Sequence, residues 1–160
     1  MLNIQDWFSK NNDDWSINRD LAEFLFASLP QGSTILELGS GKGTEILSSM
    51  YNMYSIEENV NFIGKYKSIY FYAPIKDGWY DTDVIRKEIA DLEYDAILID
   101  GPAYGERSGF YDWLHLFKTD RMMIFDDIDR PADLQVLKDV AKEVNREYIT
   151  LPDGQTGIIL

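Results

Sequence analysis

A short apolar segment that runs directly into closely spaced glycines is the feature that most limits the folds open to this chain. Residues 35–38 read Ile-Leu-Glu-Leu, which predicts a buried strand, and Glu37 is the one acid within it. Glycines follow at alternate positions: Gly39, Gly41 and Gly43. Such a loop can turn tightly and approach a ligand, because glycine has no Cβ. A helix beginning near Thr44 would point its free N–H groups into the loop, so the pattern predicts a binding site for a nucleotide-like cofactor.

The glycine spacing fits neither of the two common phosphate-binding loops. The dinucleotide-binding loop, G-x-G-x-x-G, needs a third glycine where this chain has Thr44. The loop G-x-x-x-x-G-K-[ST], aligned on Lys42, needs a glycine where the chain has Leu36, and Ser or Thr where it has Gly43. The simplest alternative to a cofactor site is a glycine-rich turn with a purely structural role.

The composition predicts a globular protein with little affinity for nucleic acid. A chain of 160 residues with 45% hydrophobic and 14% aromatic residues can build a core of ordinary size. Its formal net charge is −13 and its Lys and Arg residues are scattered, whereas nucleic-acid binding favours a basic patch. The sequence has no cysteine, no signal-like start and no apolar run of about 20 residues, so we expect a cytoplasmic protein that does not enter a membrane.

Strand and helix signals alternate along most of the chain. An amphipathic segment at the start contains a helix that Asn18 can cap and that ends near Pro30. After it, strands are expected at residues 35–38, 53–57, 69–72, 95–100 and 122–125. Helices are expected at residues 44–51, 82–92, 110–117 and 131–145. This alternation predicts a doubly wound parallel sheet.

The end of the chain predicts an antiparallel addition to that sheet. Residues 147–151 and 156–160 flank Asp153 and Gly154, a pair typical of a β-hairpin turn. We therefore expect a single domain over residues 1–160. It would consist of a helical segment, residues 1–31, and a cofactor-binding sheet, residues 32–160.

The motif Glu37-x-Gly39-x-Gly41-x-Gly43 resembles the first motif of the class I S-adenosylmethionine-dependent methyltransferases. The C-terminal hairpin resembles the end of their sheet, in which the last strand inserts antiparallel. The resemblance covers residues 34–160 and implies a Rossmann-like α/β fold, a doubly wound, seven-stranded and mostly parallel sheet that binds S-adenosylmethionine (SAM). The cofactor-binding residues expected from it are Glu37, Gly39, Ser40, Gly41, Gly43, Thr44, Glu57, Glu58, Ile75 and Asp100.

An acid after the second strand is expected to bind the ribose of the cofactor. Glu57 stands 18 positions after Gly39, and its carboxylate can accept hydrogen bonds from two hydroxyls. Glu58 is the alternative, and a solvated acid near a helix start is the simpler explanation. After the third strand no acid occurs before Asp77, so the adenine is expected to meet backbone groups and the apolar side chain of Ile75 or Trp79.

Acids also follow two later strands of the expected sheet, with Asp100 after one and Asp126 and Asp127 after the next. This pattern resembles the metal site of catechol O-methyltransferase-like enzymes, in which an Asp and an Asp-Asn pair bind magnesium. In this chain Asp127 stands where those enzymes have Asn. Such oxygen ligands suit Mg²⁺ or Ca²⁺. The alternative is structural, because Asp126 can accept hydrogen bonds from backbone amides and Asp129 can cap the following helix.

Without a metal, Asp100 or His115 is the candidate general base. His115 is the only histidine, and its apolar neighbours also suit a packed structural role. Arg107 is expected to pair with an anionic group of a substrate or with Glu106. Aromatic side chains are expected to wall an acceptor pocket: Tyr104, Tyr111 and Trp113, with Trp7 or Trp15.

These observations predict a SAM-dependent enzyme that methylates an oxygen of a small hydroxylated acceptor, with or without Mg²⁺. The N-terminal segment and two loops are all that the chain leaves for selectivity, which suits a small molecule better than a macromolecule. Two alternatives stay open, since fold does not settle function. One is a different enzyme on the same scaffold, acting on a nucleoside or a sugar. The other is a non-catalytic module that binds SAM or a partner protein. A homo-oligomer is compatible with the sequence.

Overall fold

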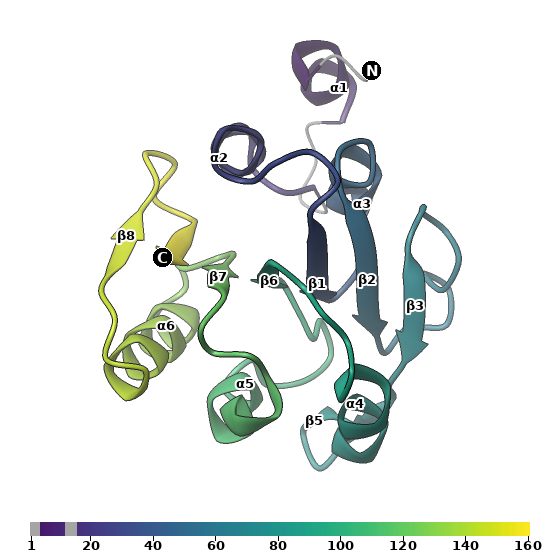
Figure 1. The fold of residues 1–160 in the computed structure, drawn as a ribbon, viewed down its shortest axis with the longest axis vertical. Helices are drawn as coiled ribbons and strands as arrows, with labels where there is room; N and C mark the ends of the chain where they lie inside the picture. Colours follow the sequence, from purple (N-terminus) through teal and green to yellow (C-terminus); the bar gives the residue numbers. More distant parts are fainter. Residues whose placement is uncertain (1–3, 12–15) are drawn as a thin grey trace.

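Seven strands form one sheet in the computed structural model, which describes residues 4–11 and 16–160. Their order is β3-β2-β1-β6-β7-β9-β8, and Figure 1 shows this sheet running across the molecule with helices on both sides. The strands are β1 (Thr34–Leu38), β2 (Asn52–Glu57), β3 (Ile69–Tyr72), β6 (Ala96–Ile99), β7 (Met122–Phe125), β8 (Tyr148–Thr150) and β9 (Gly157–Ile159). The expected doubly wound sheet is therefore confirmed, and its strand order reverses between β1 and β6.

The sheet is parallel except at one edge. Strands β3, β2, β1, β6 and β7 pair in parallel. Strand β9 then pairs antiparallel with both β7 and β8, so the last strand of the chain inserts between them. The side chain of Asp153 holds the connecting turn by accepting hydrogen bonds from the backbone N–H groups of Gln155 and Thr156. The predicted C-terminal hairpin is confirmed.

Three helices cover each face of the sheet. In Figure 1, α1 (Ile4–Lys10), α2 (Arg19–Ser28) and α3 (Lys42–Leu47) lie above it, and α4 (Thr82–Ile89), α5 (Gly109–Asp112) and α6 (Pro131–Glu143) lie below. Side chains of successive strand residues point to opposite faces, so each strand contributes to two cores. Ile35 packs in the core between the sheet and α1–α3, and Leu36 packs in the core between the sheet and α4–α6. A strand buried on both faces explains the continuous apolar runs in the sequence.

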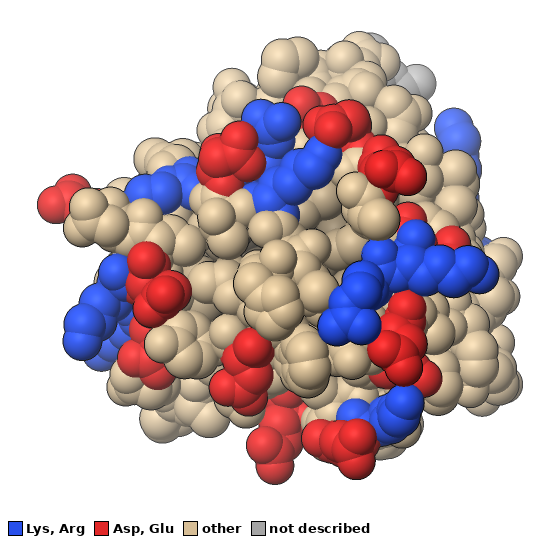
Figure 2. Space-filling model, turned by 60° about the horizontal axis from the view of Figure 1, so that its bottom comes forward, with Lys and Arg blue, Asp and Glu red and all other residues tan. Residues whose placement is uncertain are grey.

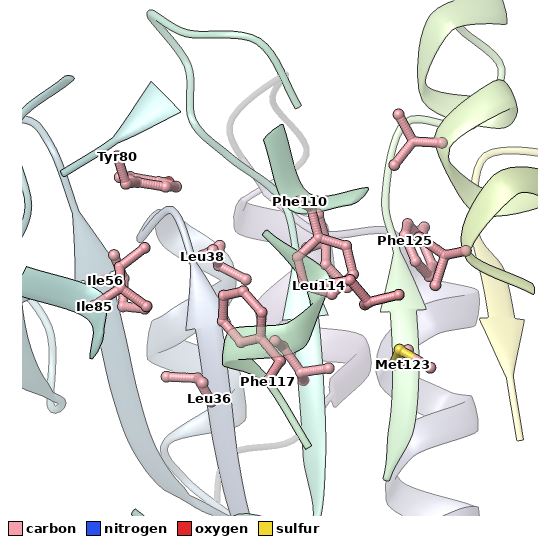
Figure 3. Packing of buried hydrophobic residues seen from close by; sticks show 14 of the residues in the cluster. Leu36, Leu38, Ile56, Tyr80, Ile85, Phe110, Leu114, Phe117, Met123 and Phe125 are labelled. Atoms are coloured by element: carbon pink, nitrogen blue, oxygen red, sulfur yellow. The ribbon is translucent and has the colours of Figure 1, made fainter. Parts of the chain in front are cut away.

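Aromatic rings fill the centre of the core between the sheet and α4–α6 (Figure 3). The ring of Phe110, from α5, lies 5.0 Å from that of Phe117 and 5.7 Å from that of Phe125. The residue before Phe110 has no room for a side chain, because a Cβ on Gly109 would lie 2.3 Å from a ring atom of Trp79. This close packing fixes where the loop after β6 enters α5, and that loop forms part of the cleft described below.

Two local predictions differ from the structure. The helix expected over residues 110–117 is split into α5 and a 3₁₀ turn, η1 (Leu114–Leu116). A small hairpin of β4 (Ile75–Lys76) and β5 (Trp79–Tyr80) was not predicted. Its signal is nevertheless present, because Asp77 (φ 54°) and Gly78 (φ 87°) form the two-residue turn with positive φ that joins short antiparallel strands.

The N-terminal segment packs against the sheet through a few anchors. Trp7 is buried and its indole N–H donates to Glu45 at 3.0 Å. Asn18 stands at the start of α2 as expected, but its side chain does not cap the helix. It donates instead to the side-chain oxygen of Gln155 at 2.7 Å. The first contact ties α1 to α3, and the second holds the start of α2 beside the C-terminal hairpin.

The face of the molecule in Figure 2 carries both signs of charge, with Lys and Arg side chains beside Asp and Glu side chains around a largely uncharged centre. Within residues 4–11 and 16–160, no helix combines the length and apolar character needed to cross a bilayer.

Candidate functional site

A cleft of about 1500 Å³ opens where β1, β2, β6 and β7 end. This is the edge of a doubly wound sheet at which ligands bind. Residues at or directly after the ends of these strands line it: Gly39, Ser40, Gly41, Glu57, Glu58, Asn59, Asp100, Asp126 and Asp127. The other walls come from the N-terminal segment, the loop after β6 and the start of α6, including Phe8, Ile17, Asn18, Tyr104, Arg107, Arg130 and Asp133.

The three glycines after β1 have different roles. Gly39 adopts φ +87°, and a Cβ there would lie 3.1 Å from the Cα of Gly101, so the loops after β1 and β6 approach backbone to backbone. Gly41 lines the cleft directly before α3. Gly43 faces the N-terminal segment, because its Cβ would lie 2.5 Å from a side-chain carbon of Ile17. Gly39 and Gly41 thus shape the cleft, whereas Gly43 packs behind it.

Glu37 lies beneath the glycine loop and does not line the cleft. Its Oε1 accepts hydrogen bonds from the hydroxyls of Thr44 (2.8 Å) and Ser55 (2.5 Å). The Thr44 hydroxyl in turn accepts the backbone N–H of Gly41 at 3.2 Å. Burial raises the pKa of Glu37 to about 7. Glu37 and Thr44 therefore position the loop rather than reach into the cleft.

Glu57 reaches the cleft with both carboxylate oxygens already oriented. Oε2 accepts the backbone N–H of Ser40 and Oε1 accepts that of Asn59, each at 2.7 Å. The carboxylate is therefore fixed between the loops that follow β1 and β2. Burial raises the pKa of Glu57 to about 7. Each oxygen keeps a second lone pair that can accept a hydrogen bond from a ligand.

Glu58 also lines the cleft, but it is bound to a different loop. Its Oε1 accepts the backbone N–H groups of Ala103 (2.8 Å) and Tyr104 (3.3 Å), which ties the end of β2 to the loop after β6. Ile75 and Trp79, expected near an adenine, are not among the residues that line the cleft. Ile75 lies in the β4–β5 hairpin and packs against the core, and Trp79 is buried in it.

The acids at the ends of β6 and β7 surround Arg107. The Nη2 atom of Arg107 donates to the carbonyl oxygen of Asp100 and to Oδ2 of Asp127, each at 2.8 Å. Its Nη1 donates to the carbonyl oxygen of Asp126 at 3.1 Å. Arg107 therefore pairs with the predicted metal ligands and not with Glu106, one of the two partners expected from the sequence.

Burial and mutual repulsion alter the protonation of this group. Burial, and then the charge of Asp126, raises the pKa of Asp100 well above its ordinary range. Burial, and then the charge of Asp127, raises the pKa of Asp126 to about 7. Burial lowers the pKa of Arg107, but the carboxylates of Asp100 and Asp127 outweigh it and raise that pKa overall. The guanidinium therefore stays charged.

The structure does not assemble the metal site that the sequence predicted from Asp100, Asp126 and Asp127. Among the residues described, no three Asp, Glu or His side chains are placed to hold one ion. The carboxylate of Asp127 turns to Arg107 and Arg130. Oδ1 of Asp126 accepts the backbone N–H of Asp127 at 3.0 Å. Asp126 and Asp127 thus already accept hydrogen bonds from groups of the protein.

Several other predicted site residues lie outside the cleft. His115 is exposed on η1, where its ring centre is 5.7 Å from that of Trp113, so the structure does not bring it to the strand ends. Tyr111 and Trp113 do not line the cleft either, and Trp7 is buried in the core. Tyr104 does line it, with 73% of its surface exposed. Trp15 lies outside the described residues.

Sequence reasoning missed the central position of Arg107. The available signal was a single cation in a loop between two strand ends rich in acids. It also missed Phe8, Ile17 and Asn18 as cleft residues. Only the path of the N-terminal segment across the strand ends reveals them.

Comparison with known proteins finds similarity in the fold alone. No family model matches the chain, and no curated protein matches it. Solved structures do match. MycE, a methyltransferase from the mycinamycin biosynthetic pathway solved with Mg, SAH and mycinamycin VI, is 11% identical, with a TM-score of 0.63. That match covers 99% of this chain and 54% of MycE, so the chain spans about half the length of that protein.

Two further matches span most of both chains. A methyltransferase-like protein from Silicibacter pomeroyi is 17% identical, with a TM-score of 0.61, and the match covers 91% of this chain and 87% of that one. The O-methyltransferase TomG from Streptomyces achromogenes, involved in tomaymycin synthesis and solved with SAM, is 13% identical, with a TM-score of 0.59. That match covers 98% of this chain and 85% of TomG. The chain therefore shares the fold of these methyltransferases.

Proposed function

We propose that this chain binds SAM in the cleft and transfers its methyl group to a small acceptor. The observation that carries the proposal is the carboxylate of Glu57, fixed at the end of β2 by the backbone N–H groups of Ser40 and Asn59. Beside it, Gly39 and Gly41 line the same part of the cleft. The same fold occurs in TomG, which was solved with SAM.

Each residue of this part of the cleft has a definite task in the proposal. Glu57 accepts hydrogen bonds from the two ribose hydroxyls, for which its oriented oxygens are suited. Gly39, Ser40 and Gly41 contact the methionine portion of the cofactor. Glu37 and Thr44 hold the loop in place through their shared hydrogen bond.

The chemistry asks little more of the protein than alignment and one proton transfer. Bound SAM supplies an activated methyl group, so the chain has to hold the acceptor oxygen in line and take up its proton. We assign the proton to Asp100 in its ionised form: its carboxylate, which lines the cleft at the end of β6, accepts the proton and becomes the neutral acid. This role needs no metal ion between Asp100, Asp126 and Asp127.

The charge of the cleft favours a neutral hydroxylated acceptor over an anionic one. Among its described lining residues, acids outnumber basic residues eight to three. An anionic acceptor would be repelled by this wall, whereas a hydroxyl can donate to it. The acids are Glu57, Glu58, Asp100, Glu106, Asp126, Asp127, Asp129 and Asp133, and the basic residues are Arg19, Arg107 and Arg130.

Calorimetry with SAM and with its demethylated product, S-adenosylhomocysteine, tests the cofactor. We expect both to bind with one site per chain, and NAD⁺ and ATP not to bind. Binding of NAD⁺ or ATP in place of SAM would overturn the assignment. A panel of phenols, sugars and carboxylates, screened by mass spectrometry for a methylated product, then tests turnover. SAM binding without any methylated product would favour the non-catalytic module instead.

A further inference from the structure

Arg107 joins the ends of two strands at the floor of the cleft. It lies in the loop between β6 and α5, and only 12% of its side chain is exposed. Its guanidinium donates to backbone carbonyls at both strand ends, those of Asp100 and Asp126. Because these bonds go to the main chain, they hold the ends of β6 and β7 together whether the acidic side chains are protonated or ionised.

The same guanidinium compensates the acids around it. Its nitrogen atoms lie 2.8 Å from Oδ2 of Asp127, 3.4 Å from Oδ1 of Asp100 and 3.9 Å from Oδ2 of Asp133. These partly buried carboxylates would repel one another without a cation between them. Arg130 also pairs with Asp127, but 61% of its side chain is exposed, so solvent weakens that pair. Arg107 is therefore the principal cation of this acidic group.

We propose that Arg107 replaces a divalent cation at the ends of β6 and β7, so that this site needs no metal ion. A hard cation would have to draw its ligands from the same acids, of which Asp127 and Asp100 already contact Arg107. To do so it would displace the guanidinium or stand beside it, with two cations close together in a partly buried place. The planar guanidinium satisfies several oxygens at once and also bonds the two backbone carbonyls. The inference concerns this charge balance alone and does not depend on SAM being the ligand.

Metal binding by the unmodified protein tests the proposal directly. We expect electron paramagnetic resonance to show no saturable Mn²⁺ site up to millimolar Mn²⁺ in the absence of SAM. The melting temperature should be the same in EDTA and in millimolar MgCl₂. One saturable Mn²⁺ site that is lost in Asp127→Asn would overturn the proposal. Because SAM is absent from this measurement, its result stands apart from the calorimetry that tests the proposed function.

Without the guanidinium, the stability of the protein should depend on a divalent cation. We expect Arg107→Gln to lower the melting temperature by about 10 °C, as for breaking a buried ion pair. MgCl₂ should then recover part of that loss. Arg130→Gln is the matched control, because it removes a guanidinium from the same Asp127 at an exposed position. Arg130→Gln should lower the melting temperature by about 2 °C or less, and MgCl₂ should not change that temperature.

A third variant covers the case in which Arg107→Gln does not fold. Arg107→Lys keeps the positive charge but loses the planar fork, so we expect a smaller loss of melting temperature than in Arg107→Gln. An Arg107→Gln or Arg107→Lys protein as stable as the unmodified chain would overturn the proposal.

Discussion

The two halves of the cleft hold their acids in different ways. At the ends of β1 and β2, Glu37 and Glu57 accept hydrogen bonds from hydroxyl and backbone N–H groups. In the described part of the chain, neither forms an ion pair with Lys or Arg. At the ends of β6 and β7, Asp100 and Asp127 pair with the guanidinium of Arg107. One half therefore uses neutral donors and the other a full positive charge.

In the proposed function, this difference separates the half that binds the ribose of the cofactor from the half that a cation of the protein holds together. Neutral donors fix the direction of a carboxylate but leave its charge uncompensated, so a ligand that donates hydrogen bonds gains from meeting it. A guanidinium instead offsets part of the negative charge and contacts one oxygen each of Asp100 and Asp127. Burial raises the pKa values of Glu37 and Glu57 to about 7. It also raises those of Asp100 and Asp126, so the guanidinium does not cancel the effect of burial in the second half.

The largest expected effect concerns stability and pH at Glu37. Its pKa is about 7 in the folded protein, against an ordinary value of 4.5. The folded state thus binds the proton more tightly than the unfolded chain, so stability falls as the pH rises from 4.5 to about 7. This change corresponds to about 3 kcal/mol at most. Urea unfolding should show that Glu37→Gln removes most of this fall in the unfolding free energy. The part of the fall that comes from Glu57 should remain.

An exposed acid provides the control for that measurement. Glu23 pairs with Arg19 on the surface of α2, with 48% of its side chain exposed. Glu23→Gln should leave the dependence of the unfolding free energy on pH unchanged. If Glu37→Gln and Glu23→Gln gave the same pH dependence as the unmodified chain, burial of Glu37 would not carry the effect.

A second prediction separates Glu57 from its neighbour Glu58. Glu57→Gln leaves one acceptor oxygen where two are used, so we expect the affinity for SAM to fall about 10-fold to 100-fold. Glu58→Gln keeps an oxygen that can accept from Ala103 and Tyr104, and the affinity should change by about threefold or less. Calorimetry on both variants decides between them. A larger loss in Glu58→Gln would move the ribose site to the alternative acid.

Much of the half of the cleft at the ends of β1 and β2 could be predicted from the sequence. An apolar strand followed by glycines has few structural solutions, and the carboxyl ends of parallel strands meet at one edge. The positions of Gly39, Gly41 and Glu57 at the cleft follow from these two facts. The Asp77-Gly78 turn was equally readable, although the short hairpin around it was overlooked.

The half of the cleft at the ends of β6 and β7 could not be predicted in the same way. Residues 101–108 form a loop without periodicity, so the sequence does not say where the side chain of Arg107 points. Its partners depend on the path between β6 and α5, which tertiary contacts such as Gly109 against Trp79 determine. Asp100, Asp126 and Asp127 were recognised as neighbours, but the group that binds them was not.

A third prediction tests whether the two halves act independently. Asp127→Asn removes one charge from the Arg107 group without straining the backbone, because Asn tolerates the positive φ of 59° at this position. We expect a loss of about 1 kcal/mol in the free energy of unfolding. The affinity for SAM should stay within about threefold of the unmodified chain, because the ion pairs of Asp127 are with Arg107 and Arg130 and not with the residues that hold Glu57. A loss of affinity as large as that of Glu57→Gln would show that the halves are coupled.

The smallest expected effect is that of His115→Gln. His115 is exposed on η1 and does not line the cleft, so its substitution removes neither a ligand contact nor a buried hydrogen bond. We expect the unfolding free energy to change by less than about 0.5 kcal/mol and the SAM affinity and methyl transfer to stay the same. Asp100→Asn is the contrasting variant, because it alters a carboxyl group within the cleft and should slow methyl transfer. If His115→Gln abolished transfer while Asp100→Asn did not, the proton acceptor would be the histidine, and the acids at the ends of β6 and β7 would be purely structural.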